Sequence, residues 1–239
     1  MLTLRLVALN IDGVLLNDTF SPVIHHFVTA RGGTYSAELE RSVFSQPQHI
    51  AGRLLAAATG GAMSGEEALA AYFEDRAAHL DRHPVTVTPG TGELLHRLRG
   101  AGLRTVCYGG LGKDHFDRHL GRYAELFDGP GYVCTNDFRP GLREITRDVF
   151  GLRPEQALFV DDVARVADAA RELGAGFVGR PSTFVHSHQR ALMAEAGVRH
   201  LISGLDELDD ALVRRIDQDL AAGTFWRTAP AAAGAGAPA

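Results

Sequence analysis

Short apolar runs alternate with amphipathic segments over most of the chain. The first run, about residues 3–9, leads directly to Asn10 and Asp12. After Pro84 the same texture returns: the strand-like segments are LRTVCYGG, GYVCTND, ALFVDD and GFVGR, and the helix-like ones are TGELLHRLRGAG, LREITRDVFG and VARVADAARELGAG. Strands and helices alternating at this spacing predict parallel strands joined by helical crossovers. The predicted fold class is therefore α/β, with an open, doubly wound parallel sheet.

One stretch near the amino terminus has a purely helical texture. The segment SPVIHHFVTARGG begins with Ser21 and Pro22, which favour a helix start, and a later segment rich in helix formers begins after Ser64, a typical N-cap residue. We therefore predict a helical insert over residues 17–88, with the sheet domain made of residues 1–16 and 89–223. The tail, 224–239, is low in complexity and is predicted to be disordered.

Composition narrows the classes of protein. A chain of 239 residues is long enough for one domain with an insert. The net charge of -5 provides no basic field for nucleic acid, and no apolar segment is long enough for a membrane span or a signal peptide. We expect a cytoplasmic protein with a small-molecule partner, and the sequence makes no prediction of oligomeric state. Cys107 and Cys134 follow strand-like apolar patterns, so both are expected to be buried free thiols.

Polar residues gather where the predicted strands end. In doubly wound sheets ligands bind at the carboxyl ends of the strands. Several carboxylates converging there would repel one another and raise one another's pKa, so such a cluster usually holds a hard cation, and oxygen ligands suit magnesium. An arginine opposite the cation would complete a phosphate site. The residues at these ends are Asn10, Asp12, Gly109, Gly110, Asp137, Arg139, Pro140, Asp161 and Asp162.

The order of these segments resembles the haloacid dehalogenase (HAD) superfamily. NIDGVLL resembles its first motif, FDGPGYVCTNDFRP the region of the third, FVDDVARVADAARELGAGFVGRP the fourth and its helix, and HLISGLDEL the final strand and helix. The helical insert lies where this family carries its cap. The resemblance implies a HAD-like core with a helical cap, a magnesium-dependent hydrolase of the phosphatase type, and a small phosphorylated substrate.

The resemblance also implies roles for individual residues. The first acid of the opening motif attacks phosphorus, and the second transfers protons. In this chain those positions are Asn10 and Asp12. The implied magnesium ligands are Asn10, Asp12 through its backbone carbonyl, Asp161 and Asp162, with Asp162 the better of the last two. A carboxamide is a poor nucleophile and brings no charge to a cation, so covalent phosphoryl transfer through Asn10 should be disabled.

Two further positions depart from the family pattern. Gly109 stands where the second motif has a serine or threonine, so Gly109 and Gly110 offer only backbone groups to a substrate. Arg139 stands before Pro140 where the third motif has lysine. Arginine keeps the charge but changes its geometry, and we assign it to catalysis and phosphate binding.

Two functions stay open at this stage. One is a hydrolase, which with Asn10 in place would use Asp12 and activated water; the other is a catalytically silent protein that binds a phosphate ligand. An engineered exchange of the acid for its amide would explain Asn10 but not Gly109, whereas natural divergence explains both, and we favour divergence. Asp161 and Asp162 would also cap the following helix.

Several other residues are weaker candidates for the site. For Lys113 and His115 we favour exposed positions at a helix start over a role in the site. The insert also carries residues that could enclose a substrate: His25, His26, His49 and Arg53.

Overall fold

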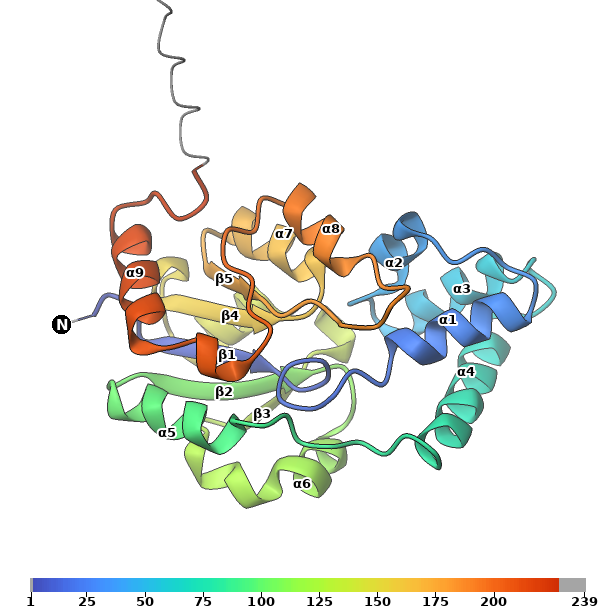
Figure 1. Cartoon of the computed structure of the whole chain (residues 1–239), viewed down its shortest axis with the longest axis horizontal. Coiled ribbons are helices and arrows are strands. Elements are labelled where there is room, and N and C mark those ends of the chain that lie inside the picture. The colour runs from blue at the N-terminus through green and yellow to red at the C-terminus, as the bar shows by residue number, and fades with distance from the viewer. Residues whose placement is uncertain (1, 228–239) are drawn as a thin grey trace, which may run out of the picture.

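A five-stranded parallel sheet forms the centre of the molecule, as the alternating pattern predicted (Figure 1). The structure is a computed structural model that describes residues 2–227. The strand order is β3-β2-β1-β4-β5. The strands are β1 (Leu6–Asn10), β2 (Arg104–Gly109), β3 (Tyr132–Cys134), β4 (Ala157–Asp161) and β5 (Gly176–Gly179). The doubly wound α/β fold is thus confirmed.

The central strand carries the first sequence motif. Every residue of β1 is buried, and an unbroken apolar run is typical of a parallel strand covered on both faces. In the register of the sheet Asn10 lies opposite Tyr108 of β2, while Leu9 pairs with Val160 of β4. The carboxyl ends of β1, β2 and β4 therefore meet at one edge, where the polar residues that follow them are brought together.

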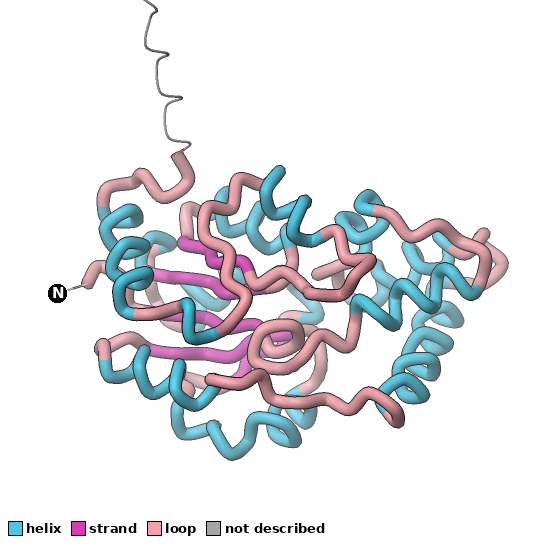
Figure 2. Tube along the Cα trace, viewed as in Figure 1, coloured by secondary structure: helices cyan, strands magenta, loops and turns pink. Residues whose placement is uncertain are grey.

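Helices cover both faces of the sheet and form a separate group at one end (Figures 1 and 2). In the core these are α5 (Thr91–Gly100), α6 (Lys113–Leu120), α7 (Ala164–Leu173), α8 (Gln189–Glu195) and α9 (Asp210–Ala221). Short 3-10 turns, η1 (Gly121–Leu126), η2 (Asn136–Phe138), η4 (Pro154–Gln156) and η5 (Leu205–Glu207), connect them, and η3 (Glu144–Val149) is a π-helix.

The insert is helical, and residues 21–83 add no strand to the sheet. Its helices are α1 (Ser21–Ala30), α2 (Ala37–Val43), α3 (Gln48–Ala58) and α4 (Gly65–Leu80). Ser64 begins α4 through a capping box with Glu67. The chain leaves and re-enters the core side by side, because the Asn17 amide donates to Thr86 O at 3.0 Å. We call α1–α4 the cap.

A buried carboxylate also joins the cap to the core. Glu40 of α2 is fully buried and accepts hydrogen bonds from Tyr35 Oη (2.6 Å), the His188 amide (2.9 Å) and Gln189 Nε2 (2.9 Å). Gln189 Oε1 in turn accepts from the amide of Ala164, the first residue of α7 (2.8 Å). We call this set the Glu40 junction; it links the cap to the helix that follows β4.

Three expectations need correction. Cys134 is free as expected but exposed, because it ends the short edge strand β3; Cys107 is buried. The expected final strand around Leu201 is reduced to a single bridge to Gly179. The predicted disordered tail starts too early, since Phe225 is buried and Trp226 Nε1 donates to Ala175 O at 2.8 Å; residues 228–239 lie outside the described part.

Candidate active site

The carboxamide of Asn10 is the centre of the site. Asn10 ends β1 and is 5% exposed. Its Nδ2 donates one hydrogen bond to the backbone carbonyl of Asp12 at 2.7 Å and another to Oδ1 of Asp162 at 2.9 Å. These two oxygens belong to residues that the resemblance assigns to magnesium. The two N–H groups of the Asn10 amide therefore donate to the same oxygens that a bound cation would be expected to coordinate.

A glycine makes room for the Asp162 carboxylate. Gly13 has a φ of 85°, a left-handed conformation that favours glycine. A Cβ at this position would lie 2.1 Å from Asp162 Oδ2. Arg180 Nη1 donates to the Gly13 carbonyl at 2.5 Å. The turn after β1 is thus shaped around the Asp162 carboxylate.

Asp161 has a different environment from Asp162. It is fully buried, accepts from Tyr108 Oη at 2.5 Å and from the amide of Val163 at 2.9 Å. Burial raises the pKa of Asp161, and burial together with the Asp161 and Asp18 charges raises the pKa of Asp162. Asp161 therefore fixes the turn into α7 and the Tyr108 ring, and only Asp162 faces Asn10.

These residues do not fit magnesium as they stand. Asn10 presents an N–H donor to the Asp12 carbonyl and to Asp162, and a donor cannot ligate a cation. Asp161 is engaged by Tyr108 and Val163. Within residues 2–227 no three His, Cys, Asp or Glu side chains gather as metal ligands. The magnesium site with Asn10, Asp12, Asp161 and Asp162 therefore stays a prediction, and it would require at least a rotation of the Asn10 carboxamide.

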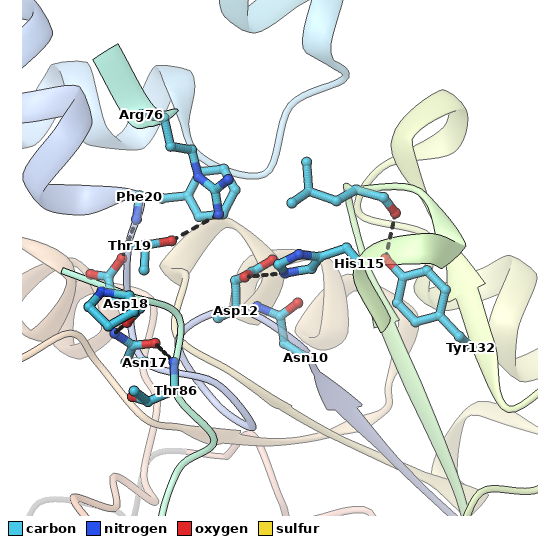
Figure 3. A network of polar contacts seen from close by, with 12 residues as sticks. Asn10, Asp12, Asn17, Asp18, Thr19, Phe20, Arg76, Thr86, His115 and Tyr132 are labelled. Carbon is cyan, nitrogen blue, oxygen red and sulfur yellow. Dashed lines mark hydrogen bonds and ion pairs between the residues drawn. The ribbon is translucent and has the colours of Figure 1, made fainter. Parts of the chain in front are cut away.

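Asp12 pairs with a histidine that sequence reasoning had left outside the site. Asp12 Oδ1 lies 2.9 Å from His115 Nε2, and both side chains are largely buried, at 13% and 12% exposure (Figure 3). His115 lies in the first turn of α6, directly after the carboxyl end of β2. Its place after a strand end was the signal that could have found it. Lys113, in contrast, is exposed and pairs with Asp117, as expected.

Arg139 lies across the cavity and fills the space beside a glycine. Its Nη2 donates to Ser45 Oγ of the cap at 3.1 Å. A Cβ on Gly110 would lie 2.5 Å from Arg139 Nη1, whereas a Cβ on Gly109 would lie 2.4 Å from Ile11 Cγ2 and 3.1 Å from Tyr132 Oη. Gly110 therefore faces the site and Gly109 faces Ile11. At both positions a hydroxyl-bearing side chain would collide with a group already present.

A cavity of about 130 Å³ lies between cap and core at this point. The core contributes Asn10, Asp12, Gly110, Arg139 and Asp162 to its wall. The cap contributes mainly apolar side chains. The site is thus covered, with its charged groups on the core side.

The remaining candidates do not line this cavity. His25 stacks on His186 with ring centroids 4.3 Å apart, on another face of the cap. Asp137 is exposed. The other candidates absent from the cavity wall are His26, His49, Arg53, Gly109 and Pro140.

Known structures share this fold. A phosphonoacetaldehyde hydrolase-like protein from Oleispira antarctica matches with a TM-score of 0.68 at 14% identity, over 92% of this chain and 95% of that chain. A putative β-phosphoglucomutase from Bacteroides vulgatus matches with a TM-score of 0.67 at 17% identity, over 91% and 90%. A HAD family hydrolase from Deinococcus radiodurans, with bound phosphate and sodium, matches with a TM-score of 0.56 at 19% identity, over 90% and 97%.

No family model and no curated protein matches the sequence. The structural matches confirm the HAD-like fold that the motifs suggested. In the described residues, no helix is both long and apolar enough to cross a bilayer.

Proposed function

On a chain with the HAD-like fold, we propose a hydrolase that acts on a small phosphorylated compound and uses the Asp12–His115 pair in place of a covalent intermediate on Asn10. The observation that carries this proposal is the 2.9 Å contact between Asp12 Oδ1 and His115 Nε2, next to a covered cavity that also holds Arg139. A carboxylate paired with an imidazole is suited to move protons. The phosphate-bound HAD family hydrolase from Deinococcus radiodurans supports the substrate class.

The chain's own residues suffice for a direct attack by water. The Arg139 guanidinium would face the phosphate group, with Gly110 contributing backbone only, while the N–H groups of Asn10 stay engaged by the Asp12 carbonyl and Asp162. Asp12 would accept a proton from water as its oxygen bonds to phosphorus. The ester P–O bond then breaks, and Asp12, which lines the cavity, would pass the proton on to the leaving alkoxide, with His115 holding the Asp12 carboxyl group in place from outside the cavity wall. The net reaction converts a phosphate monoester and water into an alcohol and inorganic phosphate.

A second function, a catalytically silent binder of a phosphate ligand, is favoured by the two hydrogen bonds of Asn10. They occupy the Asp12 carbonyl and Asp162, so the attacking acid and the cation that the resemblance implies are replaced together by one neutral amide. Such a site keeps Arg139 and the covered cavity for binding. It does not need the Asp12–His115 pair for chemistry.

The two functions are separated by turnover and binding measured on the same protein. We expect the full-length chain to hydrolyse p-nitrophenyl phosphate in the presence of chelator, and Asp12→Asn and His115→Gln each to reduce kcat by about 10²–10⁴-fold, the usual contribution of general acid–base catalysis. Asp114→Asn, on the same turn of α6, is the matched control and should keep its activity.

The binder would give another pattern. No turnover would be detected with or without magnesium, while inorganic phosphate would raise the melting temperature of the wild-type chain and of Asp12→Asn, but not that of Arg139→Ala. That pattern would refute the hydrolase and support the binder. Absence of both turnover and stabilisation by phosphate would refute both functions.

A further inference from the structure

The cap side of the cavity is almost entirely apolar. No lysine or arginine of the cap lines it. The cap contributes two short polar stretches to the cavity wall. Its apolar residues in the wall form a larger set: Phe20, Ile24, Val43, Phe44, Ala51, Leu55, Leu69, Tyr72 and Phe73. A ligand whose charged group meets Arg139 therefore meets carbon on the opposite side.

Most polar side chains of the cavity wall already have partners within the protein. Gln46 Nε2 donates to Ser42 O at 3.0 Å, and Gln48 Nε2 donates to Gly110 O at 3.2 Å. Asn136 Oδ1 accepts from the amide of Gln48 at 3.0 Å. These groups satisfy one another, so they offer little to the hydroxyl groups of a ligand.

Two polar atoms in residues of the wall are left without partners. Tyr72 is 4% exposed, and its hydroxyl has no hydrogen-bond partner among the described residues; Arg139 Nε is also buried and unpaired. A buried hydroxyl without a partner is unfavourable. A ligand atom that accepts a hydrogen bond would remove this cost.

The size of the cavity limits the apolar part of the ligand. Its volume of about 130 Å³ is close to the roughly 150 Å³ of an engineered apolar cavity that binds benzene. The apolar group that this space can bury is therefore about the size of one aromatic ring. A sugar of similar size would bury several hydroxyls against carbon, which is unfavourable when they lack partners.

We propose that the cavity selects a phosphate monoester of a single aromatic ring, with one hydrogen-bond acceptor on the ring for Tyr72, and discriminates against sugar phosphates. This inference rests on the proposed function for the phosphate end, and it adds the chemical class of the group attached to it. The cap supplies the ring site, and Arg139 on the core supplies the site for the anion.

Phosphonates test the ring site without turnover, because their C–P bond is not a phosphate ester. Isothermal titration of the full-length chain would compare phenylphosphonate, methylphosphonate and glucose 6-phosphate. We expect phenylphosphonate to bind at least tenfold more tightly than the other two, equivalent to about 1.4 kcal/mol. Equal affinities for the phenyl and methyl compounds, or tighter binding of the sugar phosphate, would overturn the ring site and leave the proposed function standing. No binding by any of the three would overturn both.

Matched variants of α3 locate the ring. Ala51 lines the cavity, whereas Ala57 on the same helix is exposed. Ala51→Leu should weaken phenylphosphonate at least tenfold and leave methylphosphonate within about twofold, and Ala57→Leu should change neither. If both variants behave like the wild-type chain, the ring does not bind in this cavity.

Tyr72→Phe tests the acceptor on the ring. One of the ortho, meta and para hydroxyphenylphosphonates should bind several-fold more tightly than phenylphosphonate, and Tyr72→Phe should abolish this advantage while retaining the affinity for the unsubstituted ring. If no substituted ring binds better to the wild-type chain, or if Tyr72→Phe retains the advantage, Tyr72 does not recognise the ligand.

Discussion

Replacing Asn10 by aspartate tests the role of its amide directly. Asn10→Asp would place a carboxylate oxygen where Nδ2 now lies, 2.7 Å from the Asp12 carbonyl and 2.9 Å from Asp162 Oδ1. Two unit charges at that separation repel by about 6 kcal/mol at an effective dielectric constant near 20. Because burial already raises the pKa of Asp162, the pair would take up a proton instead of holding both charges.

The loss of stability in Asn10→Asp depends on which interactions a shared proton can restore. A shared proton restores one hydrogen bond between the two carboxyl groups, but the Asp12 carbonyl then faces an oxygen without a donor. We expect Asn10→Asp to lower the free energy of unfolding by about 2–3 kcal/mol in chelator, the usual loss for an unpaired buried polar group and a weakened charge-assisted bond. For a chain of this size this corresponds to a fall of about 4–12 °C in melting temperature.

Magnesium should reverse this loss in the variant. Oxygens that share an octahedral magnesium at adjacent positions lie about 3 Å apart, close to the spacing around Nδ2. Differential scanning fluorimetry with magnesium or chelator would show a magnesium-dependent rise for Asn10→Asp and little response for the wild-type chain. Asn17→Asp, in the linker, is the control and should show neither effect. Equal stability of Asn10→Asp and wild type in chelator, or equal stabilisation of both by magnesium, would refute the idea that the amide replaces a cation.

Three further predictions concern the scaffold of the site. Gly13→Ala should lower the free energy of unfolding by about 3 kcal/mol or more in urea titrations, because its Cβ would collide with the Asp162 carboxylate; an unchanged midpoint would contradict the described turn. Glu40→Ala should cost about 2–4 kcal/mol, since three donors lose their acceptor, and Glu38→Ala on the exposed side of α2 is its control; equal losses would argue against the junction. Burial lowers the pKa of His200 below its ordinary 6.5, so the unfolded chain binds the proton more readily, and the stability present above about pH 6.5 should decline as the pH falls below it. His200→Phe should reduce that decline in urea titrations at pH 7.5 and 5.5, and an unchanged decline would exclude His200 as a contributor.

The fold could be predicted because its signals are local. Each buried strand is a short apolar run, and the polar residue after the run marks the edge where ligands bind. Asn10, Asp12, Arg139 and Asp162 were found in this way, and they do line one cavity. The outer end of the sheet was harder to predict from the sequence, because the apolar segment around Leu201 pairs with the sheet through only one bridge.

Partnerships between distant side chains were not predictable. The place of His115 after a strand end could indicate that it lies near the site, but not that it contacts Asp12, because that contact joins residues 103 positions apart. The two acids after β4 look equivalent in the sequence, but Tyr108 and Val163 engage Asp161 and leave Asp162 for Asn10. The local sequence pattern predicts which residues lie at the edge of the sheet, and tertiary packing determines the direction in which their side chains point.

The Glu40 junction has a consequence for the rate at which ligands exchange. The cap covers the cavity, and it is joined to the core by the two linkers, by hydrogen bonds of Ser45 and Gln48 at the cavity, and by a buried carboxylate with three donors. Lifting the cap at this junction would break those bonds and bring the carboxylate into water. Association and release would then be timed by this opening, and dissociation would be slow even for a ligand of modest affinity. The residues that set the residence time of a ligand would thus include Glu40 on α2 and Gln189 at the start of α8, which do not line the cavity.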